Sequence, residues 1–152
     1  MTAVIQRVTE AAVSVDGTIV GSCEKGLMIL LGVFREDCEK DAELLATKIS
    51  KLRIFTDEND KLNLSVNDIN GGALVISNFT LCANYRHGNR PDYISAQAPD
   101  RANELYMYFV ERLRSLLVSG QVGTGTFGEH MVITPALDGP ITIVMDSNVL
   151  KK

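Results

Sequence analysis

The sequence predicts an α+β domain in which a curved, barrel-like antiparallel β-sheet packs against two main helices. Short apolar and β-branched runs, which are typical of strands, outnumber the helical patterns. The two helical patterns are separate in sequence. With 152 residues, the chain is long enough to form one domain, residues 1–152, around its own hydrophobic core.

The first third of the chain carries the clearest strand signals. Residues 2–8 (TAVIQRV) predict a strand that places Ile5 and Arg7 on one face. Two β-branched runs flank Asp16-Gly17, a dipeptide typical of a two-residue hairpin turn. Residues 26–34 (GLMILLGVF) are continuously apolar and predict a buried central strand.

Two segments show helical periodicity. The first follows Asp37, a candidate N-cap, and its apolar residues recur at spacings of four and three. The second begins at Pro99-Asp100, and Gly120 is its expected end. The apolar stripe of the first is Leu45, Ile49 and Leu52, and that of the second is Ala102, Leu105, Phe109, Leu113, Leu116 and Leu117.

The remaining segments are shorter. Residues 56–72 are polar and predict a loop with one short strand at most, and residues 73–79 predict a strand. Residues 83–93 form a basic loop that contains Gly and Pro. Residues 130–136 and 141–146 predict two final strands, joined by Leu-Asp-Gly-Pro.

Composition excludes several functional classes. The three cysteines, Cys23, Cys38 and Cys82, are widely spaced, so we expect neither a zinc site nor a disulfide framework, and a reducing cytoplasm fits best. We expect no signal peptide, and the apolar run at 26–34 is too short to span a membrane. The net charge of −4 does not suit an extended DNA- or RNA-binding surface, so any nucleic acid is expected to be contacted locally.

Familiar catalytic sets are missing. His87 and His130 are the histidines of the chain, and neither forms a recognisable Ser-His-acid pattern with other residues. The glycines of residues 123–128 (GTGTFG) have the wrong spacing for a phosphate-binding loop. We therefore expect no metal or organic cofactor, and an enzyme with this sequence would depend on substrate placement and on backbone groups.

Two clusters of residues stand out, and each has two interpretations. Residues 76–81 (ISNFTL) place Ser, Asn and Thr together at the end of a strand. These residues form either a reactive site or a polar strand end whose side chains bond nearby backbone groups. Residues 127–142 (FGEHMVITPALDGPIT) contain Gly-Pro before an apolar run. The Gly-Pro is either part of a site or the turn of a β-hairpin.

The chain resembles D-aminoacyl-tRNA deacylases from end to end. The resemblance rests on AVIQRVTEAAVSVDG, GLMILLGV, SNFTL, GNRP, TGTFGEHM and DGPIT. Two signatures of that family are Ser-Gln-x-Thr-Leu and Asn-x-Gly-Pro-Val-Thr, which residues 77–81 (SNFTL) and 137–142 (LDGPIT) match. The chain departs from them by Asn78 for Gln, Leu137 for Asn and Ile141 for Val.

The resemblance implies a homodimer with active sites at the subunit interface. Members hydrolyse the ester between a D-amino acid and the 3′-terminal adenosine of tRNA. The family's Gly-Pro peptide is cis and enters the partner's site, so Gly139 and Pro140 would hold the substrate's α-ammonium group through their carbonyls. The same backbone would exclude an L side chain, and glycyl-tRNA would be tolerated.

The resemblance also implies roles for other residues. Ser77, Asn78, Phe79 and Thr80 would line the scissile carbonyl, where backbone N–H groups stabilise the oxyanion. Thr80 has no evident adjacent base, so hydrolysis assisted by the terminal 2′-hydroxyl of the tRNA is expected in place of a Thr nucleophile.

Further positions carry substrate-binding predictions. Arg7 would hold the Gly-Pro segment, or would be a surface cation on an edge strand. Phe127 and Met131 would line the adenosine pocket, or would belong to the core. Arg86 and Arg90 would meet phosphates of the CCA end, or would lie in a solvated loop.

Two alternative functions are open at this point. Asn78 and Leu137 fit a divergent deacylase for another aminoacyl ester. A catalytically silent dimer that binds tRNA 3′ ends would retain the same pocket without turnover.

Overall fold

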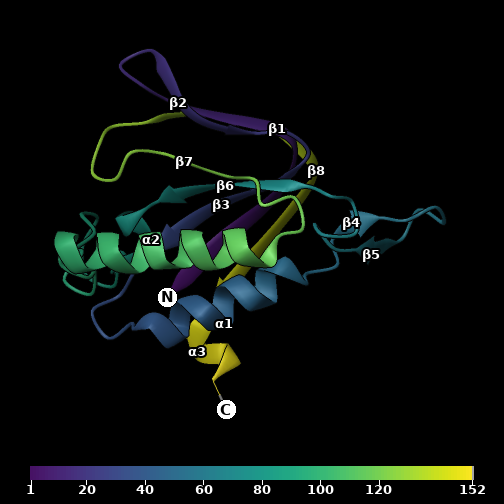
Figure 1. Cartoon of the computed structure of the whole chain (residues 1–152). Coiled ribbons are helices and arrows are strands. Elements are labelled where there is room, and N and C mark those ends of the chain that lie inside the picture. The colour runs from purple at the N-terminus through teal and green to yellow at the C-terminus, as the bar shows by residue number, and fades with distance from the viewer. Residues whose placement is uncertain (152) are drawn as a thin grey trace.

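The computed structural model describes residues 1–151 and shows a strongly curved sheet with helices on one side (Figure 1). Helices α1 and α2 lie side by side beneath the sheet, and α3 follows at the C-terminal end. The elements are β1 (Thr2–Val15), β2 (Thr18–Cys23), β3 (Gly26–Gly32), α1 (Glu39–Ser50), β4 (Phe55–Thr56), β5 (Leu62–Leu64), β6 (Gly72–Ser77), a 3₁₀ turn (Phe79–Cys82), α2 (Pro99–Leu116), β7 (Val122–Thr124), β8 (Val132–Asp146) and α3 (Ser147–Leu150).

The main sheet confirms the predicted α+β class with a barrel-like sheet. Within residues 1–151, its strand order is β2-β1-β3-β6-β7, with β8 paired to the free side of β1. Strand β2 also lies against β7, which nearly closes the sheet. The expectation of an antiparallel sheet needs correction, because β3–β6 and β6–β7 are parallel pairs. Each of these pairs is joined by a crossover that contains a helix, as parallel strands require.

The predicted hairpin at Asp16-Gly17 is confirmed. Asp16 (φ 49°) and Gly17 (φ 79°) both have positive φ, which a type I′ turn requires. The strand predicted at residues 2–8 and the β-branched run before Asp16 form one continuous strand, β1. One side of β1 pairs along its length with β8, and the other side is shared between β3 and β2.

The prediction of two final strands joined by a turn is wrong. Residues 132–146 form the single strand β8, and both of its halves pair antiparallel with β1. Between the pairs Val8–Leu137 and Gln6–Thr142, residues 138–141 face Arg7 alone, so Gly139-Pro140 lies in a bulge and not at the tip of a hairpin.

Both predicted helices form, with shifted ends. Cys38 and not Asp37 is the N-cap of α1, and the Asp41 carboxylate accepts the Cys38 N–H at 3.0 Å. Helix α2 begins at Pro99 as predicted. It ends before Gly120, which forms the next turn with φ 63°. Strand β7 and helix α3, each of four residues or fewer, were not predicted.

The hydrophobic core lies between the sheet and helices α1 and α2. The predicted stripes of both helices supply it, with Leu45 and Phe109 fully buried against strand residues such as Ile29 and Val75. Burying a side chain of this size contributes about 1.5–3 kcal/mol. Within residues 1–151, no helix combines the length and the apolar character that crossing a membrane requires.

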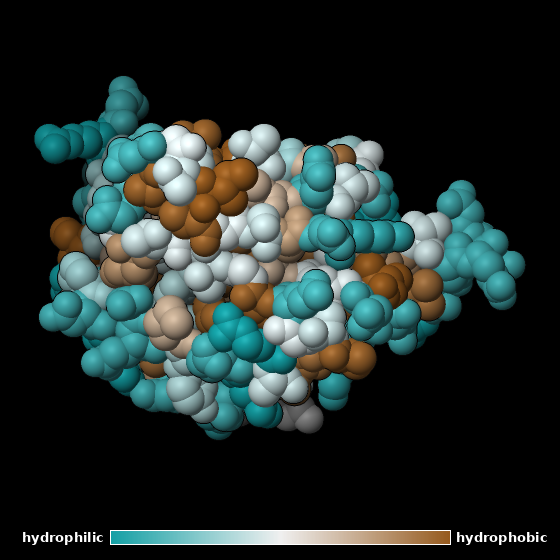
Figure 2. All heavy atoms as spheres, turned by 45° about the horizontal axis from the view of Figure 1, so that its top comes forward, coloured by the Kyte–Doolittle hydropathy of each residue, from teal (hydrophilic) through white to brown (hydrophobic). Residues whose placement is uncertain are grey.

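Strands β4 and β5 form a separate small projection on the right of Figure 1. Figure 2 shows that the same side of the molecule ends in hydrophilic side chains. The Asp57 carboxylate organises this tip by accepting the backbone N–H groups of Asn59 and Lys61 at 2.8 and 3.0 Å. These hydrogen bonds lower the Asp57 pKa.

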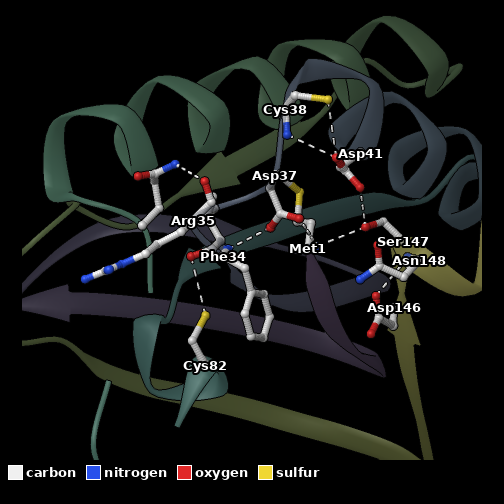
Figure 3. A network of polar contacts seen from close by, with 12 residues as sticks. Met1, Phe34, Arg35, Asp37, Cys38, Asp41, Cys82, Asp146, Ser147 and Asn148 are labelled. Atoms are coloured by element: carbon white, nitrogen blue, oxygen red, sulfur yellow. Dashed lines mark hydrogen bonds and ion pairs between the residues drawn. The ribbon is translucent and has the colours of Figure 1, made fainter. Parts of the chain in front are cut away.

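A buried polar cluster joins residues from the start and the end of the described chain (Figure 3). The Met1 ammonium group lies 2.5 Å from Asp37 Oδ1 and donates to Ser147 Oγ at 2.9 Å. Ser147 donates to Asp41, which also pairs with Lys151 at 2.7 Å. Burial acts to raise the Asp41 pKa, but the hydrogen bonds from Lys151, Ser147 and Cys38 prevail and hold it well below its usual range.

Candidate functional site

The segment of residues 77–80 is placed by the end of β6. Strand β6 is buried between two parallel neighbours and ends at Ser77. The Asn78 N–H then donates to Leu31 O at 2.8 Å, and the chain enters the 3₁₀ turn. A side chain at Gly32 would lie 2.8 Å from Leu81 Cβ, so glycine at that position allows the turn to pack directly on β3.

This segment lines a cavity of about 1000 Å³. The cavity lies between the end of the central strands, the start of α2 and residues 127–133. The structure therefore brings together two clusters that are 50 residues apart in sequence. The predicted residues that share this cavity are Ser77, Asn78, Phe79, Thr80, Phe127 and Met131.

Aromatic rings form two walls of the cavity. Phe79 meets Tyr93 edge to face with ring centroids 5.0 Å apart, and Tyr106 lies 6.0 Å from Phe127. The Tyr106 hydroxyl donates to Val75 O at 2.8 Å. Burial raises the pKa of Tyr106 to about 12, so its hydroxyl stays neutral at physiological pH. Such a wall suits a flat, uncharged ring such as a nucleobase.

The polar groups of the cavity include a hydroxyl without a basic partner. Thr80 Oγ1 donates to the side-chain oxygen of Asn78 at 2.5 Å. An amide oxygen accepts a hydrogen bond but does not remove the proton, so this contact does not activate Thr80 as a nucleophile. Phe79 and Thr80 are also the first residues of the 3₁₀ turn, where N–H groups lack partners within the turn.

Gly139 and Pro140 are exposed and do not line this cavity within one chain. The peptide bond between them is cis. Arg7 holds the start of their segment: its Nε donates to Asp138 O at 2.9 Å, and its Nη1 donates to Ile54 O and Thr56 Oγ1, each at 3.1 Å. Arg7 is only 9% exposed, so it is not a surface cation.

The two arginines of the basic loop do not line the large cavity. Arg86 lines a second, smaller cavity, and Arg90 lines neither of the two. The large cavity has polar residues that the sequence analysis did not select, namely Arg35, Gln97, Glu129 and His130. Arg35 and Gln97 lie on loops without a motif. Glu129 and His130 belong to TGTFGEHM, one of the segments that carry the family resemblance, although that resemblance gave them no role.

Comparison with known proteins identifies the family. The family model described as D-Tyr-tRNA(Tyr) deacylase matches residues 4–146. The chain belongs to the D-Tyr-tRNA deacylase family. A relative from Persephonella marina, named D-aminoacyl-tRNA deacylase, is 52% identical over 150 residues, which cover 99% of this chain and 100% of the relative. One of the same name from Caldicellulosiruptor saccharolyticus is 50% identical, with 97% of each chain covered.

Two solved structures share the fold of this chain. The structure titled "c-Myc DNA Unwinding Element Binding Protein" is 37% identical, with a TM-score of 0.90 over 96% of this chain and 98% of that chain. A structure titled as a probable eukaryotic D-amino acid tRNA deacylase has a TM-score of 0.82 over 96% of this chain and 100% of that chain, at 16% identity. The second comparison supports the fold alone.

Proposed function

We propose that this protein hydrolyses the ester bond of D-aminoacyl-tRNA in the cytoplasm and leaves L-aminoacyl-tRNA intact. The observation that carries the proposal is the cavity in which Ser77–Thr80 of one family signature meets Phe127 and Met131. The family assignment supplies the substrate class. The cavity volume of about 1000 Å³ is ample for a nucleoside with an aminoacyl group.

The terminal adenosine binds between the aromatic walls. Its base packs near Phe127 and Met131, beside the Tyr106 ring. The ribose and the ester then point toward residues 77–80. This orientation brings the scissile carbonyl beside the first N–H groups of the 3₁₀ turn.

Hydrolysis proceeds through stabilisation of the oxyanion and not through a protein nucleophile. The N–H groups of Phe79 and Thr80 donate to the oxygen that becomes negative, a contribution of about 3–4 kcal/mol per donor. The contact of Thr80 with the Asn78 amide leaves the terminal 2′-hydroxyl of the tRNA as the better group to orient the attacking water. Asn78, shorter than the glutamine of the family signature, has its oxygen engaged by Thr80.

A second copy of the chain completes the site. Gly139 and Pro140 are exposed on a bulge that Arg7 holds, and they are directed to the partner's cavity, where their carbonyls accept the substrate's α-ammonium group. The outer face of β8 supports such an interface, because Val132, Leu137 and Val144 expose 57%, 49% and 70% of their surface on an edge strand.

Selection follows from this geometry. The Gly139-Pro140 backbone occupies the space into which an L side chain would project, whereas a D side chain points to solvent. Glycine has no side chain to exclude, so glycyl-tRNA is a substrate as well.

An ester-hydrolysis assay tests the proposal. The protein is mixed separately with D-tyrosyl-tRNA, L-tyrosyl-tRNA and glycyl-tRNA, and the loss of each ester is followed. Fast loss of the D and glycyl esters with a stable L ester is expected. Loss of D and L esters at equal rates would indicate a deacylase of another specificity, and binding without loss of any ester would indicate a silent tRNA-binding dimer.

The mechanism has its own test. Thr80→Ala is expected to retain substantial activity, whereas D-tyrosyl-tRNA ending in 2′-deoxyadenosine is expected to be hydrolysed slowly. The opposite pair of results would make Thr80 the nucleophile.

A further inference from the structure

A second cavity of about 440 Å³ adjoins the large one. Two paired segments, residues 33–35 and 95–97, separate them. Phe34 and Ser95 line the small cavity, whereas the next residue of each segment, Arg35 and Ala96, lines the large one. The Arg35 N–H donates to Ser95 O at 3.0 Å, so the two cavities share one hydrogen-bonded wall.

The small cavity has the groups that bind a nucleotide of a single strand. Tyr85, a residue that is 79% exposed, lines it, and Arg86 adds a guanidinium group. An exposed aromatic ring beside a cation is the usual arrangement for stacking a base and contacting the backbone. The nearby Asp92 carboxylate is engaged within the loop, because it accepts hydrogen bonds from Asn84 Nδ2 and from the Ile94 N–H.

The shared wall also carries a suitable cation. Arg35 and Arg86 form no salt bridge within residues 1–151. Figure 3 shows the Arg35 side chain pointing away from Asp37 and Asp41. Its backbone is fixed, because the Phe34 N–H donates to Asp37 Oδ2 at 2.7 Å and Gln97 Nε2 donates to Arg35 O at 3.0 Å.

We propose that the small cavity binds the nucleotide that precedes the terminal adenosine of the tRNA. Its base stacks on Tyr85, and Arg35 on the shared wall contacts the phosphate that joins the two nucleosides. This subsite rests on the proposed function, because it requires adenosine in the large cavity. A chain that leaves that cavity across the wall at Arg35 enters the small cavity directly.

Two non-hydrolysable probes test the subsite. One is 3′-amino-3′-deoxyadenosine that carries D-tyrosine in amide linkage, and the other is the same compound extended at its 5′ end by a cytidylate. The affinity of the folded wild-type protein for each probe is measured by calorimetry. We expect the dinucleotide probe to bind at least about tenfold more tightly, given the usual size of base stacking on an aromatic ring.

Variants test which residues cause the higher affinity of the dinucleotide probe. Tyr85→Ala should remove most of the gain and leave the affinity for the mononucleoside probe unchanged. Arg35→Gln, whose side chain lies on the shared wall, should lower the affinity for the dinucleotide probe more than the affinity for the mononucleoside probe. Tyr85→Phe should retain the gain, because its ring still stacks. Lys40→Gln, which removes an exposed charge from α1, should change neither affinity.

The outcomes separate this subsite from the proposed function. Equal wild-type affinities for the two probes, or variants that weaken both probes equally, would overturn the subsite while D-ester hydrolysis still supports the function. Failure of both probes to bind, together with absent D-ester hydrolysis, would overturn both.

Discussion

The two signature segments of this chain leave the same sheet in different ways. Residues 77–80 end β6 and turn into an open cavity that residues of one chain line. Residues 138–141 interrupt β8 on the outer edge of the sheet, where Gly139 and Pro140 face outward. The first segment therefore lines a cavity within one chain, whereas the second is exposed at the outer edge of the sheet.

The two segments are also fixed by different forces. The first is held through its backbone, by the bond from Asn78 N–H to Leu31 O and by close packing on Gly32. The second is held through one side chain, because Arg7 binds Asp138 at one end of its guanidinium group and Ile54 and Thr56 at the other. A substitution that alters the backbone should therefore be needed to disable the first segment. Replacing one side chain, that of Arg7, should loosen the second.

The largest effect on turnover is expected when one backbone N–H group is removed from the first segment. Phe79→Pro removes the N–H at the first position of the 3₁₀ turn, where proline is well tolerated, and the preceding residue, Asn78, already has the extended conformation that proline favours. Turnover of D-tyrosyl-tRNA should fall by about 10²–10³-fold relative to Phe79→Ala, which loses the ring and retains the N–H. Equal rates for the two variants would exclude this N–H group from catalysis.

Gly139→Ala should have the next largest effect. Gly139 has φ 153°, and a Cβ there would lie 2.3 Å from Ile141 N, so the segment must shift at a local cost of about 1–3 kcal/mol. D-ester hydrolysis should fall severely, while binding of adenosine to the cavity is retained. Gly120→Ala, at another glycine of positive φ that has open space around it, is the control. Wild-type hydrolysis by Gly139→Ala would make the bulge irrelevant to the reaction.

Arg7→Lys should have a smaller and more selective effect. Lysine cannot bind Asp138 and the Ile54–Thr56 segment at once, so the bulge becomes less fixed. The ratio of D-ester to L-ester hydrolysis should fall about tenfold, equivalent to about 1.4 kcal/mol. Arg53→Lys, which changes an exposed arginine bonded to Asn63 O, should leave the ratio unchanged. An unchanged ratio in Arg7→Lys would show that Arg7 does not set the specificity.

The smallest effect on turnover is expected far from both segments, in the polar cluster around Asp41. Its pKa is depressed in the folded protein, so the charged form stabilises the fold above the unfolded pKa of about 3.9, and this stabilisation is lost as the pH falls below it. Asp41→Asn should unfold more easily than the wild type at pH 7, by about 1–3 kcal/mol, and the difference should shrink below pH 4. The hydrolysis rate at pH 7 should not change.

Denaturant unfolding at several pH values measures this difference. Asp60→Asn, on the exposed β4–β5 projection, should not show the pH-dependent difference. A constant difference between Asp41→Asn and the wild type from pH 7 to pH 3 would contradict the assigned charge state.

The sequence anticipated the parts of the fold that local chemistry determines. The Asp16-Gly17 turn and the start of α2 at Pro99 follow from backbone preferences of single residues. The parallel pairing of β3 with β6 and the joining of residues 132–146 into one strand depend on which strands meet in space, and local pattern does not contain that information. Local pattern left open whether Arg7 holds the Gly-Pro segment or lies at the surface, because its partners lie 47 or more residues away.

The candidate site shows the same division. The motifs selected residues 77–80 and Phe127, and the structure brought them to one cavity. Arg35 and Tyr93 reached its wall through loops whose sequences have no periodic pattern. The contact between Thr80 and Asn78 depends on the 3₁₀ turn, which the strand predicted at 73–79 did not anticipate.

Mixing two inactive variants tests most directly whether one site takes one segment from each of two chains. Phe79→Pro disables the first segment, Gly139→Ala disables the second, and the two proteins are exchanged into mixed dimers before D-tyrosyl-tRNA is added. In a shared site, each mixed dimer has one intact pair of segments, so random mixing should restore about one quarter of the wild-type rate. Activity that stays at the level of the separate variants, in dimers shown to have exchanged, would contradict the account.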